Sequence, residues 1–252
     1  MINHAFFIEL STVARAAIAE ALAAGLTPES KDPAGFDPVT EADRAAERAM
    51  RQAIEQAFPD HGIWGEEYGL TRGSSSVRWS LDPVDGTRAL VCGLPSWAVL
   101  VGLIEDGKHI AGMIDLPAIH ERLVAIDGRT LRNGAQVASS GCRTISDARW
   151  STTDPFLFDG AEADAVARIR ATAKVARYGL DAMAYARVAT GDIDLVVENK
   201  LQPHDIDALV AVVRGAGGHF GDWDGGADFS RGRVIAAATR ELYDEAIALL
   251  AG

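Results

Sequence analysis

Apolar residues recur at helical spacing in two segments near the N-terminus. The first segment covers residues 3–24, and the side chains that set its period are Phe7, Leu10, Val13, Ala17 and Leu22. The second covers about 40–58 and begins with Thr40-x-x-Asp43, which fits a capping box. We therefore predict two helices, joined by a Pro- and Gly-rich loop at 27–36.

The middle of the chain shows the runs and turns of an antiparallel sheet. Residues 97–104 form a continuous apolar run, and Asp106-Gly107 predicts a hairpin turn into a partner strand at 109–115. A third strand at 122–126 extends this meander. Together with the two N-terminal helices, these strands predict an α+β arrangement for the first half of the chain.

Beyond 138–141 the pattern changes to alternating strands and helices. The predicted strands are 149–152, 175–178, 193–198, 219–222 and 234–238. The predicted helices are 161–172, 181–190, 205–215 and 240–250. This alternation is typical of a mixed α/β sheet, so we predict two parts, 1–139 and 140–252.

Charge narrows the function classes. The 252 residues carry a net charge of −12 and no basic run, which argues against nucleic-acid or anionic-membrane binding. An acidic protein that handles an anionic substrate needs a local cationic centre, and a bound metal is one way to supply it. The N-terminus lacks a basic leader, no apolar run approaches membrane-spanning length, and the two cysteines, Cys92 and Cys142, are predicted to be reduced and buried. We expect a cytoplasmic protein.

The candidate chemistry centres on Asp82-Pro83-Val84-Asp85-Gly86-Thr87. This stretch follows a short apolar strand at 79–81, and its Pro83 predicts a turn. Two carboxylates three residues apart suit a hard cation such as Mg²⁺. Gly86 and Thr87 open a predicted helix whose free N–H groups suit a phosphate. The alternative is a polar turn with an aspartate as a helix cap.

Two further acidic positions have equally plain alternatives. Glu66 and Glu67 follow Gly65 at the end of an apolar segment. They are either a solvated strand end or metal ligands. Asp205 lies at the start of a predicted helix. It either caps that helix or presents its carboxylate to a cluster of acidic residues from other parts of the chain. For Asp43, capping alone is a sufficient explanation.

The order of these motifs, together with Asp37-Pro38-Val39-Thr40-Glu41-Ala42-Asp43, resembles the inositol-monophosphatase superfamily of Mg²⁺-dependent, lithium-sensitive phosphatases. Within it, four segments are most similar to the histidinol-phosphate phosphatases: 151–155, 178–181, 194–198 and 201–205. The chain departs from that pattern at His204, at Leu180 and at Arg88-Ala89-Leu90. None of these departures removes a metal ligand.

The resemblance implies specific roles. Glu66, Asp82 and the Val84 carbonyl resemble ligands of a first metal, and Asp82, Asp85 and Asp205 resemble ligands of a second, with two or three Mg²⁺ per site. It also implies that Gly86 and Thr87 hold the phosphate, and that the Thr87 hydroxyl, oriented by Asp43, works with Glu66 to position the attacking water.

The physics supports such a site. Four clustered carboxylates repel one another and raise their own pKa values unless cations neutralise them. Two metals about 3.5–4 Å apart can lower the pKa of water and stabilise the leaving oxygen. Because the chain carries no cysteine-nucleophile or phospho-aspartyl motif, we expect direct attack by metal-activated water.

The resemblance implies a layered αβαβα sugar-phosphatase fold, a homodimer and L-histidinol phosphate as substrate. We predict that Asp181, at the start of a helix, and Glu198, at the end of a strand on the rim of the pocket, bind the cationic groups of that substrate through their carboxylates. Two alternatives remain. One is inositol 1-phosphate on the same metal site, and the other is a non-catalytic cation-binding protein, which would need neither Thr87 nor Asp43.

Overall fold

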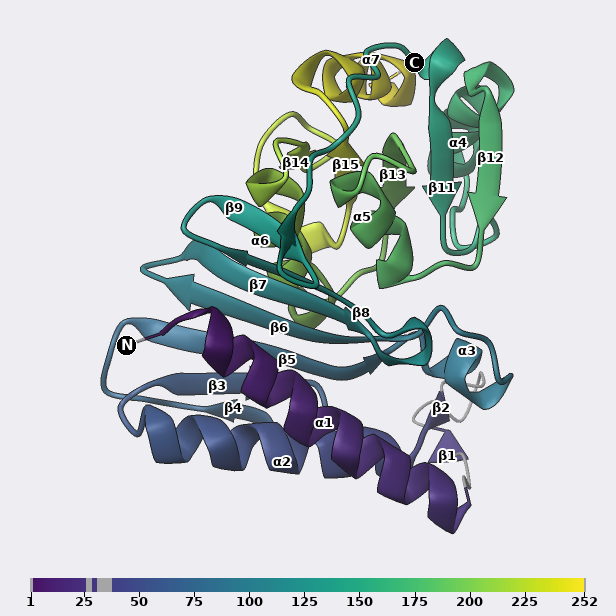
Figure 1. Cartoon of the computed structure of the whole chain (residues 1–252). Helices are drawn as coiled ribbons and strands as arrows, with labels where there is room; N and C mark the ends of the chain where they lie inside the picture. The colour runs from purple at the N-terminus through teal and green to yellow at the C-terminus, as the bar shows by residue number, and fades with distance from the viewer. Residues whose placement is uncertain (1, 26–28, 31–37, 252) are drawn as a thin grey trace.

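The computed structural model describes residues 2–25, 29–30 and 38–251, and it arranges them in five layers. Two N-terminal helices cover one face of an eight-stranded sheet (Figure 1). Two helices from the second half lie against its other face and separate it from a five-stranded sheet. A last pair of helices covers the far side of the second sheet. The predicted layered αβαβα fold is confirmed.

The first layer consists of α1 (His4–Ala24) and α2 (Glu41–Ala57). The buried stripe of α1 differs in part from the predicted one, because Leu22 is exposed and the core takes Phe6, Phe7, Leu10, Ala14 and Ile18. Thr40 and Asp43 form the predicted capping box of α2. Part of the predicted loop at 27–36 lies outside the described residues, and β1 (Glu29–Ser30) pairs there with β2 (Pro38–Val39).

The eight-stranded sheet contains the predicted meander and has the order β10-β9-β8-β7-β6-β5-β3-β4. Only β3 and β5 pair in parallel; the other neighbours are antiparallel. The strands are β3 (Gly62–Gly65), β4 (Gly69–Thr71), β5 (Val77–Asp85), β6 (Ala98–Glu105), β7 (Lys108–Leu116), β8 (Glu121–Ile126), β9 (Arg129–Arg132) and β10 (Ala135–Gln136). The sequence pattern did not predict β4, because Gly69–Thr71 is short and mostly exposed.

A bulge in β5 replaces the predicted turn at Pro83. Asp82 pairs with Leu100 and Asp85 with Ala98, so three steps along β5 match two along β6. Side chains alternate between the faces of a regular strand, so residues three apart point to opposite sides. The extra residue removes that opposition and allows Asp82 and Asp85 to face the same side. Proline lacks the N–H that a regular ladder needs. It is tolerated here because the bulge interrupts the ladder at this point.

The middle layer contains α5 (Ala182–Ala189) and α6 (Pro203–Gly215). Val210, Val212 and Val213 of α6 are fully buried, in one apolar cluster with Leu100, Ile114 and Leu123 of the first sheet and Val196 and Ala236 of the second. Because α6 packs on the sheet of the first half, the division at residues 139 and 140 stays a prediction.

The second sheet has the order β12-β11-β13-β15-β14 and is mixed, as the alternation predicted. Its strands are β11 (Arg149–Thr152), β12 (Val175–Tyr178), β13 (Leu195–Glu198), β14 (His219–Gly221) and β15 (Val234–Ala237). Its outer helices are α4 (Ala161–Thr172) and α7 (Arg240–Ala251). One short helix, α3 (Thr87–Val91), follows β5.

The two cysteines are free, and the prediction that both are buried is wrong. Cys92 is exposed and Cys142 is partly buried. Among the described residues, no helix is both long enough and apolar enough to cross a membrane.

His61 beneath the first helix layer provides a test of the packing there. Its Nδ1 accepts a hydrogen bond from Trp79 Nε1 at 3.0 Å, and its ring stacks on Phe58 at 4.9 Å. Burial lowers the pKa of His61. The contribution of neutral His61 to the free energy of unfolding is therefore complete above the unfolded pKa of about 6.5. It is lost as pH falls through the lower pKa of the folded state.

We expect the indole N–H resonance of Trp79 to move as pH falls from about 7 to about 5, because protonated Nδ1 no longer accepts its hydrogen bond. His61→Gln should remove this titration. An indole resonance that is unchanged over the range in the wild type would contradict the assignment.

Candidate active site

Three carboxylates from distant parts of the chain converge where β5 ends and α6 begins. Asp82 and Asp85 come from the bulged end of β5, and Asp205 occupies the third position of α6. One oxygen from each lies within 4.8 Å of the other two. The structure therefore brings together three of the predicted metal ligands.

Glu66 lies beside this trio because β3 runs parallel to β5. Gly65 pairs with Leu81, and the next backbone N–H, that of Glu66, donates to the Leu81 carbonyl at 3.1 Å. Glu66 is thereby placed level with Asp82, and both line one cavity.

Burial and mutual repulsion dominate the electrostatics. Asp82 is 2% exposed, and burial, followed by the charges of Glu66, Asp85 and Asp205, raises its pKa well above the usual range. Burial and neighbouring acids also raise the pKa of Asp85 well above that range, and burial raises the pKa of Asp205. Clustered acids of this kind resist ionisation unless cations are close.

Backbone N–H groups partly offset the repulsion. Asp82 Oδ1 accepts from the Val84 N–H at 3.0 Å, and Asp205 Oδ2 from the Gln202 N–H at 2.6 Å. Asp85 Oδ2 accepts from the Ala182 N–H at 2.7 Å, at the start of α5. These bonds fix each carboxylate and leave its remaining lone pairs for a ligand.

The residues present suit a hard cation. All four side chains offer oxygen ligands, which Mg²⁺ prefers. Burial and the neighbouring acids raise the pKa values of Asp82, Asp85 and Asp205, so a cation close by would stabilise their ionised forms. The Val84 carbonyl, the fifth predicted ligand, lines the same cavity. It already accepts from the Thr87 hydroxyl at 2.9 Å and retains a second lone pair.

Thr87 and Asp43 meet beside the carboxylates, as predicted. The Thr87 hydroxyl lies 3.3 Å from Asp43 Oδ1, while Asp43 Oδ2 accepts from the Thr40 N–H and hydroxyl at 2.9 and 2.5 Å. Asp43 is 1% exposed, and burial raises its pKa. Asp43 therefore both caps α2 and contacts Thr87, so the two readings of this residue are compatible.

Gly86, predicted to bind phosphate, has two reasons to be glycine. Its φ of 77° lies in the left-handed region. A Cβ there would also lie 2.9 Å from Asp181 Oδ2. Asp181 thus lies directly against the predicted phosphate loop, and burial raises its pKa to about 6.

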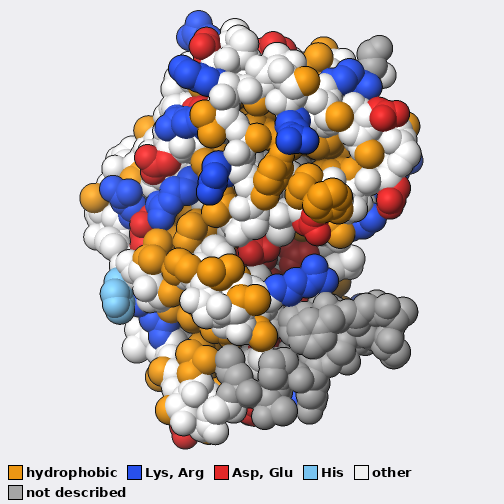
Figure 2. Space-filling view, turned by 90° about the vertical axis from the view of Figure 1, so that its right-hand side faces the viewer, with side chains coloured by type: hydrophobic (Ala, Val, Ile, Leu, Met, Phe, Trp, Pro, Cys, Tyr) orange, Lys and Arg blue, Asp and Glu red, His pale blue; other side chains and the backbone are white. Residues whose placement is uncertain are grey.

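The site is a hollow with two connected parts. Figure 2 shows acidic side chains gathered in a depression on this face of the molecule. The outer part, of about 940 Å³ including open space, contains the metal-ligand candidates with Gly86, Thr87, Arg88 and His204. The inner part, of about 610 Å³, shares Asp85, Asp181 and Asp205 with it and extends to Glu198.

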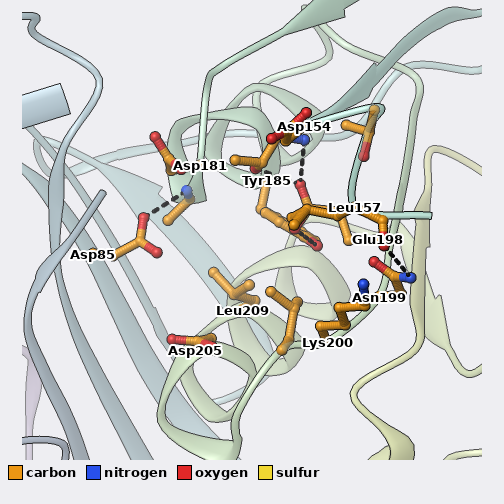
Figure 3. A pocket seen from close by; sticks show the side chains of 14 residues that line it. Asp85, Asp154, Leu157, Asp181, Tyr185, Glu198, Asn199, Lys200, Asp205 and Leu209 are labelled. Atoms are coloured by element: carbon orange, nitrogen blue, oxygen red, sulfur yellow. Dashed lines mark hydrogen bonds between the residues drawn. The ribbon is translucent and has the colours of Figure 1, made fainter. Parts of the chain in front are cut away.

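Glu198 lies deeper than predicted. It is 4% exposed, so its expected place at the pocket rim is wrong. Its Oε1 accepts from the Thr153 N–H and hydroxyl at 2.9 and 2.6 Å, and its Oε2 from the Tyr185 hydroxyl at 3.0 Å. Burial is the main cause that raises its pKa to about 7. In Figure 3, Asp85 and Glu198 lie on opposite sides of the inner part.

Several residues that line or support the site were not predicted. Leu157, Leu201 and Leu209 line the inner part, and Thr153 and Tyr185 hold Glu198. The segment 151–155 contributed to the resemblance, which is a signal for Thr153. Leu201 has the same signal, because it begins the segment 201–205. Tyr185, Leu157 and Leu209 have none, since each of them fits an ordinary apolar position.

Comparisons with known proteins agree with this geometry. The model of the inositol monophosphatase family matches residues 4–251. The chain is 39% identical over 224 residues to the bifunctional phosphatase IMPL2, chloroplastic, of Arabidopsis thaliana. That alignment covers 84% of this chain and 65% of the plant protein, so the chain spans slightly less than two thirds of that relative's length.

Two further relatives match over most of both chains. A histidinol-phosphatase of Mycobacterium tuberculosis is 34% identical over 230 residues, which are 84% of each chain. A solved structure of an inositol monophosphatase from Zymomonas mobilis has 36% identity and a TM-score of 0.87, and covers 98% of this chain and 96% of the other.

The acidic cluster predicts a pH-dependent response to Mg²⁺. Because the folded pKa values of these acids exceed the unfolded value of about 4, the metal-free fold binds protons more tightly than the unfolded chain. Its free energy of unfolding therefore falls as pH rises from about 4 through the raised folded pKa values. We expect Mg²⁺ to raise the melting temperature more at about pH 8 than at about pH 6, measured against EDTA.

Asp82→Asn should raise the melting temperature in EDTA, since it removes the most buried charge of the acidic cluster, and should reduce the Mg²⁺ response. An exposed Asp164→Asn is the control for the lost charge. A Mg²⁺ response that is identical at both pH values and in Asp82→Asn would contradict this account of the cluster.

Proposed function

The chain belongs to the inositol monophosphatase family of phosphatases, and we propose that it uses Mg²⁺ to hydrolyse L-histidinol phosphate to L-histidinol and phosphate. The resemblance inferred from the motifs is confirmed by the family match and the histidinol-phosphatase relatives. The observation that carries the substrate proposal is the acidic inner part of the site, where Asp181 lies against the predicted phosphate loop and Glu198 lines the same space farther in.

In this proposal Glu66, Asp82, Asp85, Asp205 and the Val84 carbonyl hold the Mg²⁺ ions. Bound Mg²⁺ supplies positive charge that offsets the phosphate, lowers the pKa of water and stabilises the leaving oxygen. The carboxylates stay ionised beside that charge, and their backbone N–H bonds keep them in place.

The chain's own residues orient the substrate and the water. Gly86 and Thr87 offer backbone N–H groups to the phosphate at the start of α3. The Thr87 hydroxyl donates a hydrogen bond to Asp43 or to the Val84 carbonyl, so a lone pair of its oxygen can accept a hydrogen bond from the attacking water. Glu66 accepts the other proton of that water. As the new P–O bond forms, Glu66 takes this proton from the water and the ester P–O bond opposite the new bond breaks. The departing alcohol oxygen takes a proton from solvent water, and Glu66 returns its proton to solvent.

Charge in the inner part favours a cationic leaving group. Two carboxylates near a phosphate disfavour an anionic leaving group, whereas the ammonium and imidazole of histidinol phosphate form charge-assisted hydrogen bonds with them. Leu157, Leu201 and Leu209 line the same space and suit the apolar faces of an imidazole ring.

Inositol 1-phosphate is the second candidate, favoured by the likeness to the Zymomonas inositol monophosphatase. Carboxylates also accept hydrogen bonds from hydroxyl groups, but a polyol gains little from the three leucines. The resemblance to the family also leads us to propose a homodimer.

The role of Thr87 can be tested by removing its hydroxyl. We expect Thr87→Ala to lower kcat by about 10²–10³, the usual cost of losing one preorganised contact to the reacting groups, with Mg²⁺ affinity close to wild type. Thr87→Ser, which keeps the hydroxyl, should retain most of the rate. A Thr87→Ala enzyme with normal kcat and a lower melting temperature would show that the residue serves only the start of α3.

The substrate proposal is tested by phosphate release across L-histidinol phosphate, inositol 1-phosphate and p-nitrophenyl phosphate, each with Mg²⁺ and with EDTA. We expect L-histidinol phosphate to have the highest kcat/KM. Asp181→Asn and Glu198→Gln should raise KM for it at least about tenfold more than for p-nitrophenyl phosphate, since each removes a charge-assisted bond.

The exposed Asp164→Asn on α4 controls for the change in net charge. Equal losses on all three substrates, or a wild-type preference for inositol 1-phosphate, would overturn the substrate assignment. Full turnover in EDTA would overturn the Mg²⁺ mechanism.

A further inference from the structure

One face of α2 carries a row of buried charged residues at intervals of four. Asp43, Glu47 and Arg51 lie above one another on the helix, since side chains four apart share a face. They are 1%, 0% and 8% exposed. Asp43 contacts Thr87, so the same face continues from the active site along the helix.

Glu47 accepts three hydrogen bonds from two directions. Its Oε1 accepts from Arg51 Nε at 2.7 Å and from the Tyr68 N–H at 3.2 Å. Its Oε2 accepts from the Glu67 N–H at 2.7 Å. A fully buried carboxylate is thus held by one arginine and by two consecutive backbone N–H groups of the turn after β3.

That turn begins with Glu66. On its N-terminal side, the Glu66 N–H is bonded to the Leu81 carbonyl, one residue before Asp82. On its C-terminal side, the next two N–H groups are bonded to Glu47. The backbone of Glu66 is therefore fixed at both ends, to β5 on one side and to α2 on the other.

The close approach is built into the sequence at Gly65. A Cβ at this position would lie 1.9 Å from Glu47 Oε1, so no larger residue fits while Glu47 keeps its place. Arg51 reaches further along the same turn and donates to the Gly69 carbonyl and to Thr71 Oγ1. The turn is shaped around the Glu47 carboxylate.

We propose that Glu47 is a positioning residue for the metal site: it fixes the turn so that the Glu66 carboxylate faces Asp82, and so sets the affinity for Mg²⁺. The proposal rests on the proposed function in that Glu66 is taken as a metal ligand. Groups that orient metal ligands typically change affinity 10–100-fold when they are replaced. The competing explanation is that Glu47 only pairs with Arg51 to stabilise α2.

Glu47→Gln separates the two explanations. Its amide keeps one acceptor oxygen and places an NH₂ group at the other position, so either the Glu67 N–H or both the Arg51 and Tyr68 donors lose their acceptor. We expect Mg²⁺ to bind the metal-free variant about 10–100-fold more weakly than the wild type, measured by titration calorimetry.

Ile54→Ala is the matched control, because Ile54 is fully buried on the same helix and belongs to the apolar core. It should lower the melting temperature and leave Mg²⁺ affinity within about twofold of wild type. If Glu47→Gln binds Mg²⁺ like the wild type, or if Ile54→Ala loses affinity as severely, the positioning role is wrong.

Glu66→Gln distinguishes a failure of this inference from a failure of the proposed function. If Glu66→Gln also binds Mg²⁺ normally, Glu66 is not a ligand and the proposed metal site is wrong. If Glu66→Gln weakens binding and Glu47→Gln does not, only the positioning role fails.

The wild type provides a measurement that does not depend on a variant folding. We expect the amide hydrogens of Glu67 and Tyr68 to be protected from exchange in the metal-free protein, as bonded and partly buried amides are. Exchange as fast as that of an exposed loop would overturn the proposal.

Discussion

The crowding of Asp82, Asp85 and Asp205 is the constraint to which the rest of the site responds. Three carboxylates with oxygens within 4.8 Å of one another destabilise a metal-free fold at neutral pH. Each is nevertheless held by a backbone N–H, from Val84, Ala182 and Gln202 respectively. The fold thus pre-positions mutually repelling charges, and a bound cation removes the repulsion. A cation bound at this cluster would for that reason also stabilise the fold.

The crowding also explains why both halves of the chain are needed. Asp205 reaches the cluster because α6, from the second half, packs its apolar face on the first sheet. Asp85 accepts from the start of α5, another element of the second half. Burial of the apolar faces of these helices stabilises the arrangement against the repulsion. The site therefore forms only when the layers are assembled.

The candidate metal ligands and the acids proposed to bind the substrate line adjoining parts of the same hollow. Asp181 lies close enough to Gly86 to leave no room for a Cβ there, and it also lines the inner part. Glu198 ends β13 at the far side, where Thr153 and Tyr185 hold its carboxylate. In the proposed binding mode, with the phosphate at Gly86, the leaving group would extend toward these two acids, and the inner part would discriminate among phosphomonoesters.

The sequence by itself determined the local elements and the acidic positions. It predicted helix 161–172 and strand 175–178 with their observed bounds, and the capping box at Thr40 and Asp43, because periodicity and capping act over a few residues. The order of its motifs also identified the family. The bulge that turns Asp82 and Asp85 to one side was not predicted, since it depends on the register with β6.

Tertiary structure alone decided which acids meet and which groups hold them. Glu47 fits an ordinary position on a charged helix, and its bonds to Glu67 and Tyr68 join residues about twenty apart. Glu198 was expected at a rim but is buried, and its carboxylate is held by Thr153 and Tyr185, which no local pattern connects to it. Such contacts leave no local signature because they depend on how separate elements pack, and packing fixes the distances between side chains.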